Sequence, residues 1–257
     1  MKPYLPKGYN QKILRAIYEF ALIEPGDRIL IGFSGGKDSA LLVWALGLMA
    51  QHRIIQAEVA ALTLDLGLEP RLNPEPLREL CARVGVEFYY LPTEIGPAAL
   101  AADDPCATCS FLRNGRLNRF ANRHQFNKVA LAHHHDDAVE TFLMSILYSG
   151  QIRTFLPRTY LDRARITVVR PLVYLREAEI KATQEFIPYQ PVARSCPYDG
   201  YTYRQKVKDL IAALNKENPA VYANLSKAMR AGRSLTLWPP ALTLSDKERG
   251  RSDEDEE

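Results

Sequence analysis

The sequence lacks the features of an exported or membrane-embedded protein. No apolar run approaches the roughly 20 residues that a membrane-spanning helix needs. Residues 1–7 contain lysines and prolines and have no apolar core of the kind a signal peptide carries. Cysteine is scarce, with four among 257 residues, so a disulfide-stabilised fold is not expected. We therefore expect a cytoplasmic protein without membrane contact, whose cysteines are free thiols, metal ligands or catalytic groups.

Acidic residues are concentrated in one short stretch near the C-terminus. Residues 246–257 hold seven acids against three basic residues, whereas the whole chain has a net charge of +3. Removing this stretch leaves 30 basic and 23 acidic residues, a net charge of +7 for positions 1–245. Such an excess favours a polyanionic partner, and the acidic stretch itself is typical of a disordered, solvated tail.

Apolar runs of strand length alternate with segments of helical periodicity. This alternation predicts an α/β fold, a doubly wound parallel sheet covered by helices on both faces. In such sheets ligands bind beyond the carboxyl ends of the strands. The expected strands are 28–33, 58–64, 86–91 and 129–132, with a last extended segment at 167–172; the expected helices include 10–23, 74–84, 110–124, 201–215 and 219–231, and a loop is expected at 92–105.

The main chemical signal is Ser34-Gly35-Gly36-Lys37-Asp38-Ser39, which lies between an expected strand and an expected helix. Paired glycines allow a tight turn and bring bare N–H groups close to a ligand. The following helix adds unpaired N–H groups and a partial positive charge, so the loop suits phosphate. A Walker A loop is excluded, because Ile31 stands where its first glycine belongs and Asp38 follows the lysine. The alternative is an ordinary polar turn.

A second signal, His133-x-x-Asp136-Asp137-x-x-Glu140-Thr141, follows the fourth expected strand at the start of a helix. Two carboxylates at a helix start are often only a cap. Three consecutive histidines suggest zinc, but adjacent side chains diverge and no i, i+4 pair is present. Asp65 ends the second strand, where it could cap a turn or meet a nucleotide or its metal.

The third signal is Cys106-x-x-Cys109 together with Cys196, whereas Cys81 falls on an apolar helical stripe and is expected in the core. Three thiolates are one fewer than a closed four-cysteine site needs, and on a four-iron cluster they would leave one iron open. A structural zinc site with His124 or His133 as the fourth ligand is the alternative. We also expect the helix N-terminus to lower the thiol pKa of the pair.

These motifs resemble those of the PP-loop N-type ATP pyrophosphatases and, among them, the TtcA group of tRNA 2-thiocytidine synthetases. The resemblance extends over residues 11–231. It is carried by Gly26-Asp27-Arg28-Ile29, the hexapeptide at 34–39, Leu64-Asp65, Pro105-Cys106-x-x-Cys109, the segment 133–141, Arg170-Pro171-Leu172 with Glu177, and Cys196. Two departures stand out: Ala132 replaces a glycine of the family pattern, and Asp199 replaces the later cysteine of a second Cys-x-x-Cys.

The resemblance implies an ATP-dependent tRNA sulfurtransferase of Rossmann-like fold. Adenylation of a base carbonyl would release pyrophosphate, and sulfur would replace the oxygen, converting cytidine 32 in the anticodon loop to 2-thiocytidine. The implied cofactors are ATP, Mg²⁺ and a 4Fe-4S cluster held by Cys106, Cys109 and Cys196. The implied partners are tRNA, a cysteine desulfurase or other sulfide donor, and a second copy of the chain.

The resemblance also implies roles and boundaries along the chain. Catalytic roles fall to Lys37, Asp38, Asp137 and the three cysteines. Nucleotide contacts fall to Ser34, Gly35, Gly36, Lys37, Asp38, Ser39, Asp65, His133, Asp136 and Asp137. We expect a helical segment at 1–24, the PP-loop domain at 25–187, a helical region at 188–244 and a disordered tail at 245–257.

Three other functions remain open from the sequence. A cluster-free PP-loop ligase would need no cysteine triad, and an iron–sulfur desulfidase of thiolated bases would need no ATP. A nucleotide-binding sensor would bind ATP without releasing pyrophosphate. Anaerobic colour and tRNA-dependent pyrophosphate release distinguish these three from the sulfurtransferase.

Overall fold

The computed structural model describes residues 3–192, 196–198 and 202–230. The expected acidic tail, the end of the last expected helix and Asp199 lie outside these residues. No helix within the described ranges has both the length and the apolar character needed to cross a membrane.

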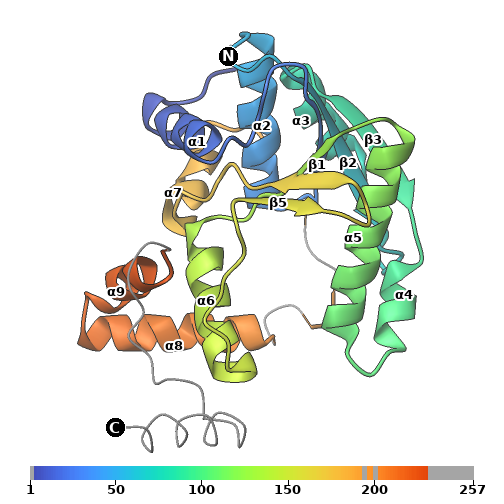
Figure 1. Ribbon diagram of the computed structural model, residues 1–257. Coiled ribbons are helices and arrows are strands. Elements are labelled where there is room, and N and C mark those ends of the chain that lie inside the picture. Colours follow the sequence, from blue (N-terminus) through green and yellow to red (C-terminus); the bar gives the residue numbers. More distant parts are fainter. Residues whose placement is uncertain (1–2, 193–195, 199–201, 231–257) are drawn as a thin grey trace, which may run out of the picture.

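Six strands form one sheet in the order β3-β2-β1-β4-β6-β5 (Figure 1). All neighbouring strands are parallel except β5, which runs antiparallel to β6. The predicted α/β fold is confirmed, but the expected parallel sheet carries this additional antiparallel edge strand. Only four residues separate β5 from β6, a connection too short for a parallel crossover. The strands are β1 (Arg28–Gly32), β2 (Glu58–Asp65), β3 (Glu87–Pro92), β4 (Lys128–Ala130), β5 (Arg158–Leu161) and β6 (Ile166–Val169).

Helices connect these strands and cover both faces of the sheet. They are α1 (Lys7–Glu19), α2 (Lys37–Gln51), α3 (Glu75–Arg83), α4 (Ile95–Leu100), α5 (Pro105–Arg123), α6 (His135–Ser149), α7 (Glu177–Ala182), the short 3₁₀ helix η1 (Thr183–Glu185), α8 (Tyr203–Glu217) and α9 (Val221–Ala228). The loop expected at 92–105 is wrong in part, because Ile95 and Ala99 are buried and α4 forms around them.

Helix α5 begins at Pro105, five residues before the start of the helix expected at 110–124. The Asp104 carboxylate accepts a hydrogen bond from the Ala107 N–H at 3.0 Å, and Pro105 occupies the first helical position. Both features are typical of a helix start. The Cys-x-x-Cys pair therefore lies on the first turns of α5 rather than in the loop before it.

The alternation of side chains along β1 assigns the two layers of the core. Ile29 and Ile31 belong to the larger apolar cluster, with α1, α2 and α3, whereas Leu30 packs with the cluster under α5. Helix α2 is buried almost all round, from Ser39 to Met49, because it lies between the sheet and its neighbouring helices. These two layers fix β1 and the loop that follows it.

Helices α8 and α9 lie against α6, away from the sheet (Figure 1). Their apolar contact is small and centres on Val139 of α6 with Val207 and Ile211 of α8. Polar contacts supply much of the remaining attachment, and several reach the motif at the start of α6.

Candidate active site

The carboxyl ends of β1, β2 and β4 meet at one edge of the sheet. β1 leads through residues 33–36 into α2, β2 ends at Asp65, and β4 leads into the start of α6. Since neighbouring parallel strands end at the same edge, the structure brings the hexapeptide, Asp65 and the 133–141 segment together there.

The hexapeptide forms a tight turn onto the first residue of α2. Gly35 has φ of +78°, a conformation that disfavours a side chain, and Gly36 is the residue before the helix. The Ser39 hydroxyl lies 3.0 Å from the Gly36 carbonyl oxygen and 3.1 Å from the Ser34 hydroxyl. The first N–H groups of α2 have no partner within the helix and favour an anion at this end.

Lys37 is held by two carboxylates. Its Nζ lies 2.9 Å from Asp38 Oδ1 and 3.5 Å from Glu177 Oε1, and its side chain is 23% exposed. Glu177 in turn accepts a 2.6 Å bond from Lys208 Nζ of α8. Burial alone would raise the pKa of Glu177, but Lys208, Lys37 and Lys181 together lower it to about 2. Glu177 is therefore a carboxylate shared between the loop lysine and α8.

The start of α6 is a capping box built from its own motif. The Asp137 N–H donates to His134 Nδ1 at 3.3 Å, and the His134 N–H donates to Asp137 Oδ2 at 2.9 Å. Arg204 of α8 lies 3.5 Å from the other Asp137 oxygen. Both carboxylate oxygens of Asp136 lie 3.1 Å from Arg176 Nε. Asp137 thus caps α6, as the helix-cap interpretation expects. Both acids also pair with arginines outside this helix, Asp136 with Arg176 and Asp137 with Arg204.

His133 is a neutral histidine in this site. Arg170 Nε donates to its Nδ1 at 3.2 Å, and its ring lies 5.1 Å from that of Phe155. Burial, followed by the positive charge of Arg170, lowers the pKa of His133 to about 3. The Nδ1 atom of His133 is thereby occupied by Arg170, so only the Nε2 atom remains for a contact with the nucleotide.

Glu140 is a buried acid whose behaviour the sequence does not reveal. Its side chain is 7% exposed, and Arg204 lies 3.3 Å from its Oε2. Burial, with the charge of Asp137, raises the pKa of Glu140 to about 7, against the opposing effect of Arg204. The carboxyl thus changes charge near neutral pH in a site dense with ion pairs.

Asp65 ends β2 with both carboxylate oxygens engaged. The Tyr90 hydroxyl donates to Oδ2 at 2.6 Å, and the Gly67 N–H donates to Oδ1 at 3.0 Å. The second bond is the turn contact that the sequence offers as an alternative. A nucleotide role for Asp65 stays a prediction.

The four cysteines differ in surroundings. Cys81 is buried, and burial raises its pKa to about 12, as expected for a core thiol, whereas Cys106 and Cys196 are exposed. Burial raises the pKa of Cys106, and the charges of Cys196, Asp104 and Cys109 raise it further. The expected lowering of this pKa by the helix end is therefore wrong, because burial and, after it, the negative neighbours raise the pKa instead. Cys109 and Cys196 both lie within electrostatic range of Cys106.

The conformation described is not a closed metal site. Within residues 3–192, 196–198 and 202–230, no three His, Cys, Asp or Glu side chains lie close enough to hold a metal ion. The chemistry of the donor set nevertheless fits an iron–sulfur cluster, since thiolates are the ligands such a cluster takes: Cys106 and Cys109 lie at the start of α5, and Cys196 lies outside any helix.

The zinc alternative loses its fourth ligand in this fold. His124 follows the last residue of α5 and stacks on Phe120 with 4.1 Å between ring centroids. At a rise of about 1.5 Å per residue, it lies roughly 27 Å along the helix from Cys106. His133 is bound to Arg170 instead. Neither histidine supports a zinc site with these cysteines.

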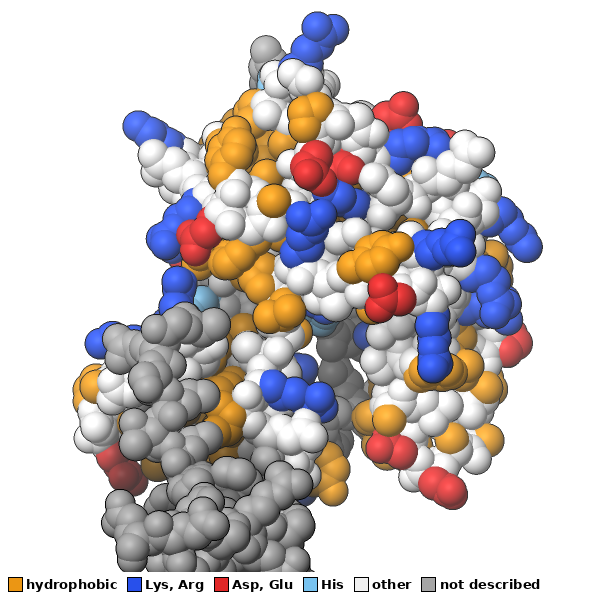
Figure 2. Space-filling view, viewed as in Figure 1, with side chains coloured by type: hydrophobic (Ala, Val, Ile, Leu, Met, Phe, Trp, Pro, Cys, Tyr) orange, Lys and Arg blue, Asp and Glu red, His pale blue; other side chains and the backbone are white. Residues whose placement is uncertain are grey.

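Basic side chains spread over the outer side of α5. Arg113, Arg116, Arg119 and Arg123 are all exposed, and their spacing of three, three and four residues places them along one side of the helix. Figure 2 shows Lys and Arg side chains gathered on the side of the molecule that carries α5, next to a hollow between α5 and α6. This surface suits a polyanion that reaches toward the sheet edge.

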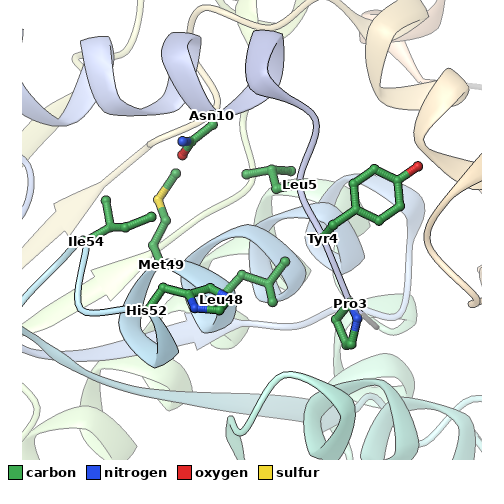
Figure 3. Close-up of a pocket in the computed structure, with 8 residues that line it drawn as sticks. All are labelled: Pro3, Tyr4, Leu5, Asn10, Leu48, Met49, His52 and Ile54. Carbon is green, nitrogen blue, oxygen red and sulfur yellow. The ribbon is translucent and has the colours of Figure 1, made fainter. Parts of the chain in front are cut away.

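A cavity lies elsewhere in the molecule. It has a volume of about 230 Å³ and is lined by eight residues from the N-terminal segment, α1, the end of α2 and the turn after it (Figure 3). The Asn10 Oδ1 atom beside it is buried without a hydrogen-bond partner. Leu48 and Met49 lie roughly 17 Å along α2 from Lys37, so this cavity is not part of the sheet-edge site.

Comparison with known proteins agrees with this arrangement. Residues 8–189 match the family model described as the PP-loop domain. A tRNA-cytidine(32) 2-sulfurtransferase of Legionella pneumophila is 34% identical over 236 residues, covering 88% of this chain and 83% of that protein. One from Geobacter sulfurreducens is 34% identical over 229 residues, covering 87% and 89%.

A solved structure shares the fold. The U34-tRNA thiolase NcsA from Methanococcus maripaludis, determined with its [4Fe-4S] cluster, superposes with a TM-score of 0.70. It is 20% identical in sequence, and the match covers 87% of this chain and 76% of that one.

Proposed function

Since this chain belongs to the PP-loop family and, within it, to the family of the tRNA-cytidine(32) 2-sulfurtransferases, we propose that it thiolates cytidine 32 of tRNA. ATP would convert the base to an adenylate, and sulfide would then attack carbon 2 and displace AMP together with the oxygen. The observation that carries the proposal is a phosphate loop at the sheet edge, in a chain that matches these enzymes over most of its length and holds Cys109 and Cys196 within electrostatic range of Cys106.

The phosphate loop would perform the first half of the reaction. The base oxygen attacks the α-phosphate of ATP, the bond to the β-phosphate breaks, and pyrophosphate leaves with the electron pair. Lys37 and the N–H groups at the start of α2 neutralise the charge that develops on the departing phosphates. Mg²⁺ would add to this neutralisation, and Asp38 and Asp137 are the carboxylates that would hold it.

Lys37 has to change partners when ATP arrives. Its contact with Glu177 is 3.5 Å long, whereas the Lys208–Glu177 contact is 2.6 Å. Lys37 can therefore turn to a phosphate without leaving Glu177 unpaired, because Lys208 and Lys181 remain beside that carboxylate. Glu177 in this account keeps the lysine near the loop until the nucleotide binds.

The cysteines would serve the second half. Cys106, Cys109 and Cys196 would hold a [4Fe-4S] cluster, which when bound would supply sulfide at the iron that lacks a protein ligand. A cysteine desulfurase or another sulfide donor would replenish the sulfur. Cys81 takes no part, because it is buried in the core.

The remaining parts of the proposal concern partners and location. The exposed arginines of α5, on a body with net charge +7 over positions 1–245, would bind tRNA phosphates. A homodimer and a cytoplasmic location complete the proposal.

Nucleoside analysis of tRNA tests the proposed function. A deletion strain that lacks the gene for this chain should lack 2-thiocytidine in its tRNA. The wild-type chain should restore 2-thiocytidine to that strain, whereas the Lys37→Ala variant should not. Unchanged 2-thiocytidine in the deletion strain would contradict the proposal. A different nucleoside lost in its place would favour a ligase, and an increase in thiolated bases would favour a desulfidase.

A further inference from the structure

Two basic side chains of α8 reach the sheet-edge site from the C-terminal helical region. Arg204 and Lys208 lie four residues apart and therefore share one face of the helix. Arg204 lies 3.5 Å from Asp137 Oδ1 and 3.3 Å from Glu140 Oε2. One turn later, Lys208 Nζ donates to Glu177 Oε2 at 2.6 Å. Helix α8 thus contacts both the start of α6 and the carboxylate at the start of α7.

The contacts of Arg204 help to determine where Lys208 lies. The apolar contact between α8 and α6 is small, so polar contacts matter for the attachment of α8. The guanidinium group of Arg204 also donates to Thr141 Oγ1 at 3.3 Å, in addition to its two carboxylate contacts. Arg204 thus attaches the first turn of α8 to α6, and Lys208 on the next turn meets Glu177.

Three lysines surround the carboxylate of Glu177, and they share its two oxygens unequally. Lys208 Nζ lies 2.6 Å from Oε2, whereas Oε1 lies 3.5 Å from Lys37 Nζ and 3.4 Å from Lys181 Nζ. Burial raises the pKa of Glu177, but the hydrogen bond from Lys208, followed by the charges of the lysines, lowers it to about 2. Lys208 is therefore the strongest of the three partners of a charged carboxylate.

Removing the charge of Lys208 would leave Lys37 with a greater share of Glu177. Among the residues that the structure describes, Lys37 and Lys181 would be the remaining cations in contact with this carboxylate. The Lys181 side chain is 61% exposed, and an exposed ion pair contributes little. The Glu177 side chain is only 18% exposed, so it would hold Lys37 more closely. Moving Lys37 to a phosphate would then cost more free energy.

We propose that Lys208 is a positioning residue for ATP binding, because it pairs with Glu177 and so allows Lys37 to leave this carboxylate for a phosphate. When ATP arrives, Lys37 exchanges Glu177 for phosphate oxygens, and Lys208 keeps the carboxylate paired. The C-terminal helical region thereby takes part in nucleotide binding, although it lies far from the phosphate loop in the sequence. The inference rests on the proposed function in taking ATP as the ligand of the loop.

Calorimetry of ATP binding to the full-length chain tests this inference. Lys208→Met keeps an apolar stem and removes the charge, so the Kd for ATP should rise about five- to tenfold. Lys208→Arg keeps a positive charge that can reach the carboxylate, so its Kd should stay within about threefold of the wild-type value. In steady-state assays, Lys208→Met should raise the KM for ATP more than it lowers kcat.

A second substitution distinguishes positioning from a purely structural role of Lys208. Glu177→Gln removes the charge that Lys208 and Lys37 share. In this background, adding Lys208→Met should change the Kd for ATP by less than about twofold. If Lys208 only supported α8, the loss of affinity would persist in the double variant. Thermal unfolding verifies that each variant is folded.

Lys206→Met is the matched control on the same helix. The Lys206 side chain is exposed, and its Nζ lies over the ring of Tyr203, 5.2 Å from the centroid, rather than beside Glu177. This variant removes the same charge from α8 and should keep the wild-type Kd for ATP. Equal weakening in Lys206→Met would mean that only the net charge of α8 matters, and it would contradict the inference.

The remaining outcomes separate this inference from the proposed function. If Lys208→Met binds ATP as tightly as the wild type, the positioning role is contradicted while the proposed function stands. A loss of affinity that persists with Glu177→Gln has the same consequence. If the wild type itself binds no ATP, the proposed function and this inference both fail.

Discussion

Two regions of the proposed site differ in how firmly the protein holds their side chains: the phosphate-loop region with Lys37, Asp137 and Glu177, and the cysteine region with Cys106, Cys109 and Cys196. Lys37, Asp137 and Glu177 are each held by partners from another helix or from their own motif. The side chains of Cys106 and Cys196, by contrast, are exposed. The first region is held by ion pairs and hydrogen bonds within the protein, whereas the thiols of the second are open to solvent.

This difference separates two kinds of binding. A preorganised loop loses little conformational freedom when a nucleotide binds, so its affinity depends on the folded chain. A cluster that ties three separate thiols together contributes its own bonds to the arrangement it needs. The two regions should therefore respond independently to mutation.

The largest expected effect comes from the thiols themselves. Serine in place of Cys106, Cys109 or Cys196 should abolish iron and acid-labile sulfide binding and lower thiolation at least a thousandfold, while the Kd for ATP changes about threefold or less. Iron, acid-labile sulfide and zinc should all be measured on anaerobically purified protein. Cys81→Ser is the control and should keep its iron, losing only stability because the thiol is buried. Stoichiometric zinc without iron would remove the sulfur-transfer mechanism.

The second-largest effect is expected from a substitution in the phosphate-loop region. Lys37→Ala should lower kcat about 10²- to 10³-fold with iron content unchanged, because the lysine acts on charge developing at the phosphates. Lys181→Ala is the matched control, since Lys181 also contacts Glu177, at 3.4 Å, but its side chain is 61% exposed. The control should stay within about twofold of wild type. Normal turnover by a folded Lys37→Ala protein would remove this lysine from the mechanism.

Asp137→Asn should separate capping from chemistry at α6. We expect kcat to fall about 10- to 100-fold with a smaller change in ATP affinity, because a carboxylate at the reacting phosphates acts on developing charge. Loss of the charged cap should also cost about 1 kcal/mol of unfolding free energy. Steady-state kinetics and urea denaturation measure the two effects. A loss of stability with full activity would mean that Asp137 only caps the helix.

The smallest effect concerns Glu140 and pH. Its pKa is raised in the folded protein to about 7, so its stabilising contribution is present below pH 4.5 and is lost as pH rises through 7. Glutamine mimics the protonated acid, so the unfolding free energy of Glu140→Gln minus that of wild type should grow by about 1 kcal/mol over this range. The lowered pKa of His133 changes the unfolding free energy with pH in the opposite direction. It acts in both proteins alike and therefore cancels in the difference. Urea denaturation at pH 5 and pH 8 measures this difference in unfolding free energy. A difference that is smaller at pH 8 than at pH 5 would contradict the expectation.

The sequence predicts well the elements that depend on local pattern. The strand–loop–helix unit around Lys37 and the placement of Asp65 at the end of β2 follow from apolar runs and glycine spacing. The buried state of Cys81 follows from helical periodicity. These features depend on neighbours within a few residues, which the sequence displays directly.

Features that depend on distant partners were missed. Strand β5 is half-exposed and has no strong apolar pattern, and it pairs only because a short turn returns the chain to β6. The role of Glu177 depends on Lys37, 140 positions earlier. The pKa of Cys106 is raised by burial and then by the charge of Cys196, 90 positions later, and the local pattern around Cys106 reveals neither cause.

The central claim is that the two regions act on one substrate in one reaction. The direct measurement is the ratio of pyrophosphate released to 2-thiocytidine formed, with anaerobically purified wild-type protein, ATP, a sulfide source and tRNA lacking the modification. The account predicts one pyrophosphate for each thiolated base, and neither product without tRNA. Thiolation without pyrophosphate, or tRNA-dependent pyrophosphate without any thiolated base, would contradict it.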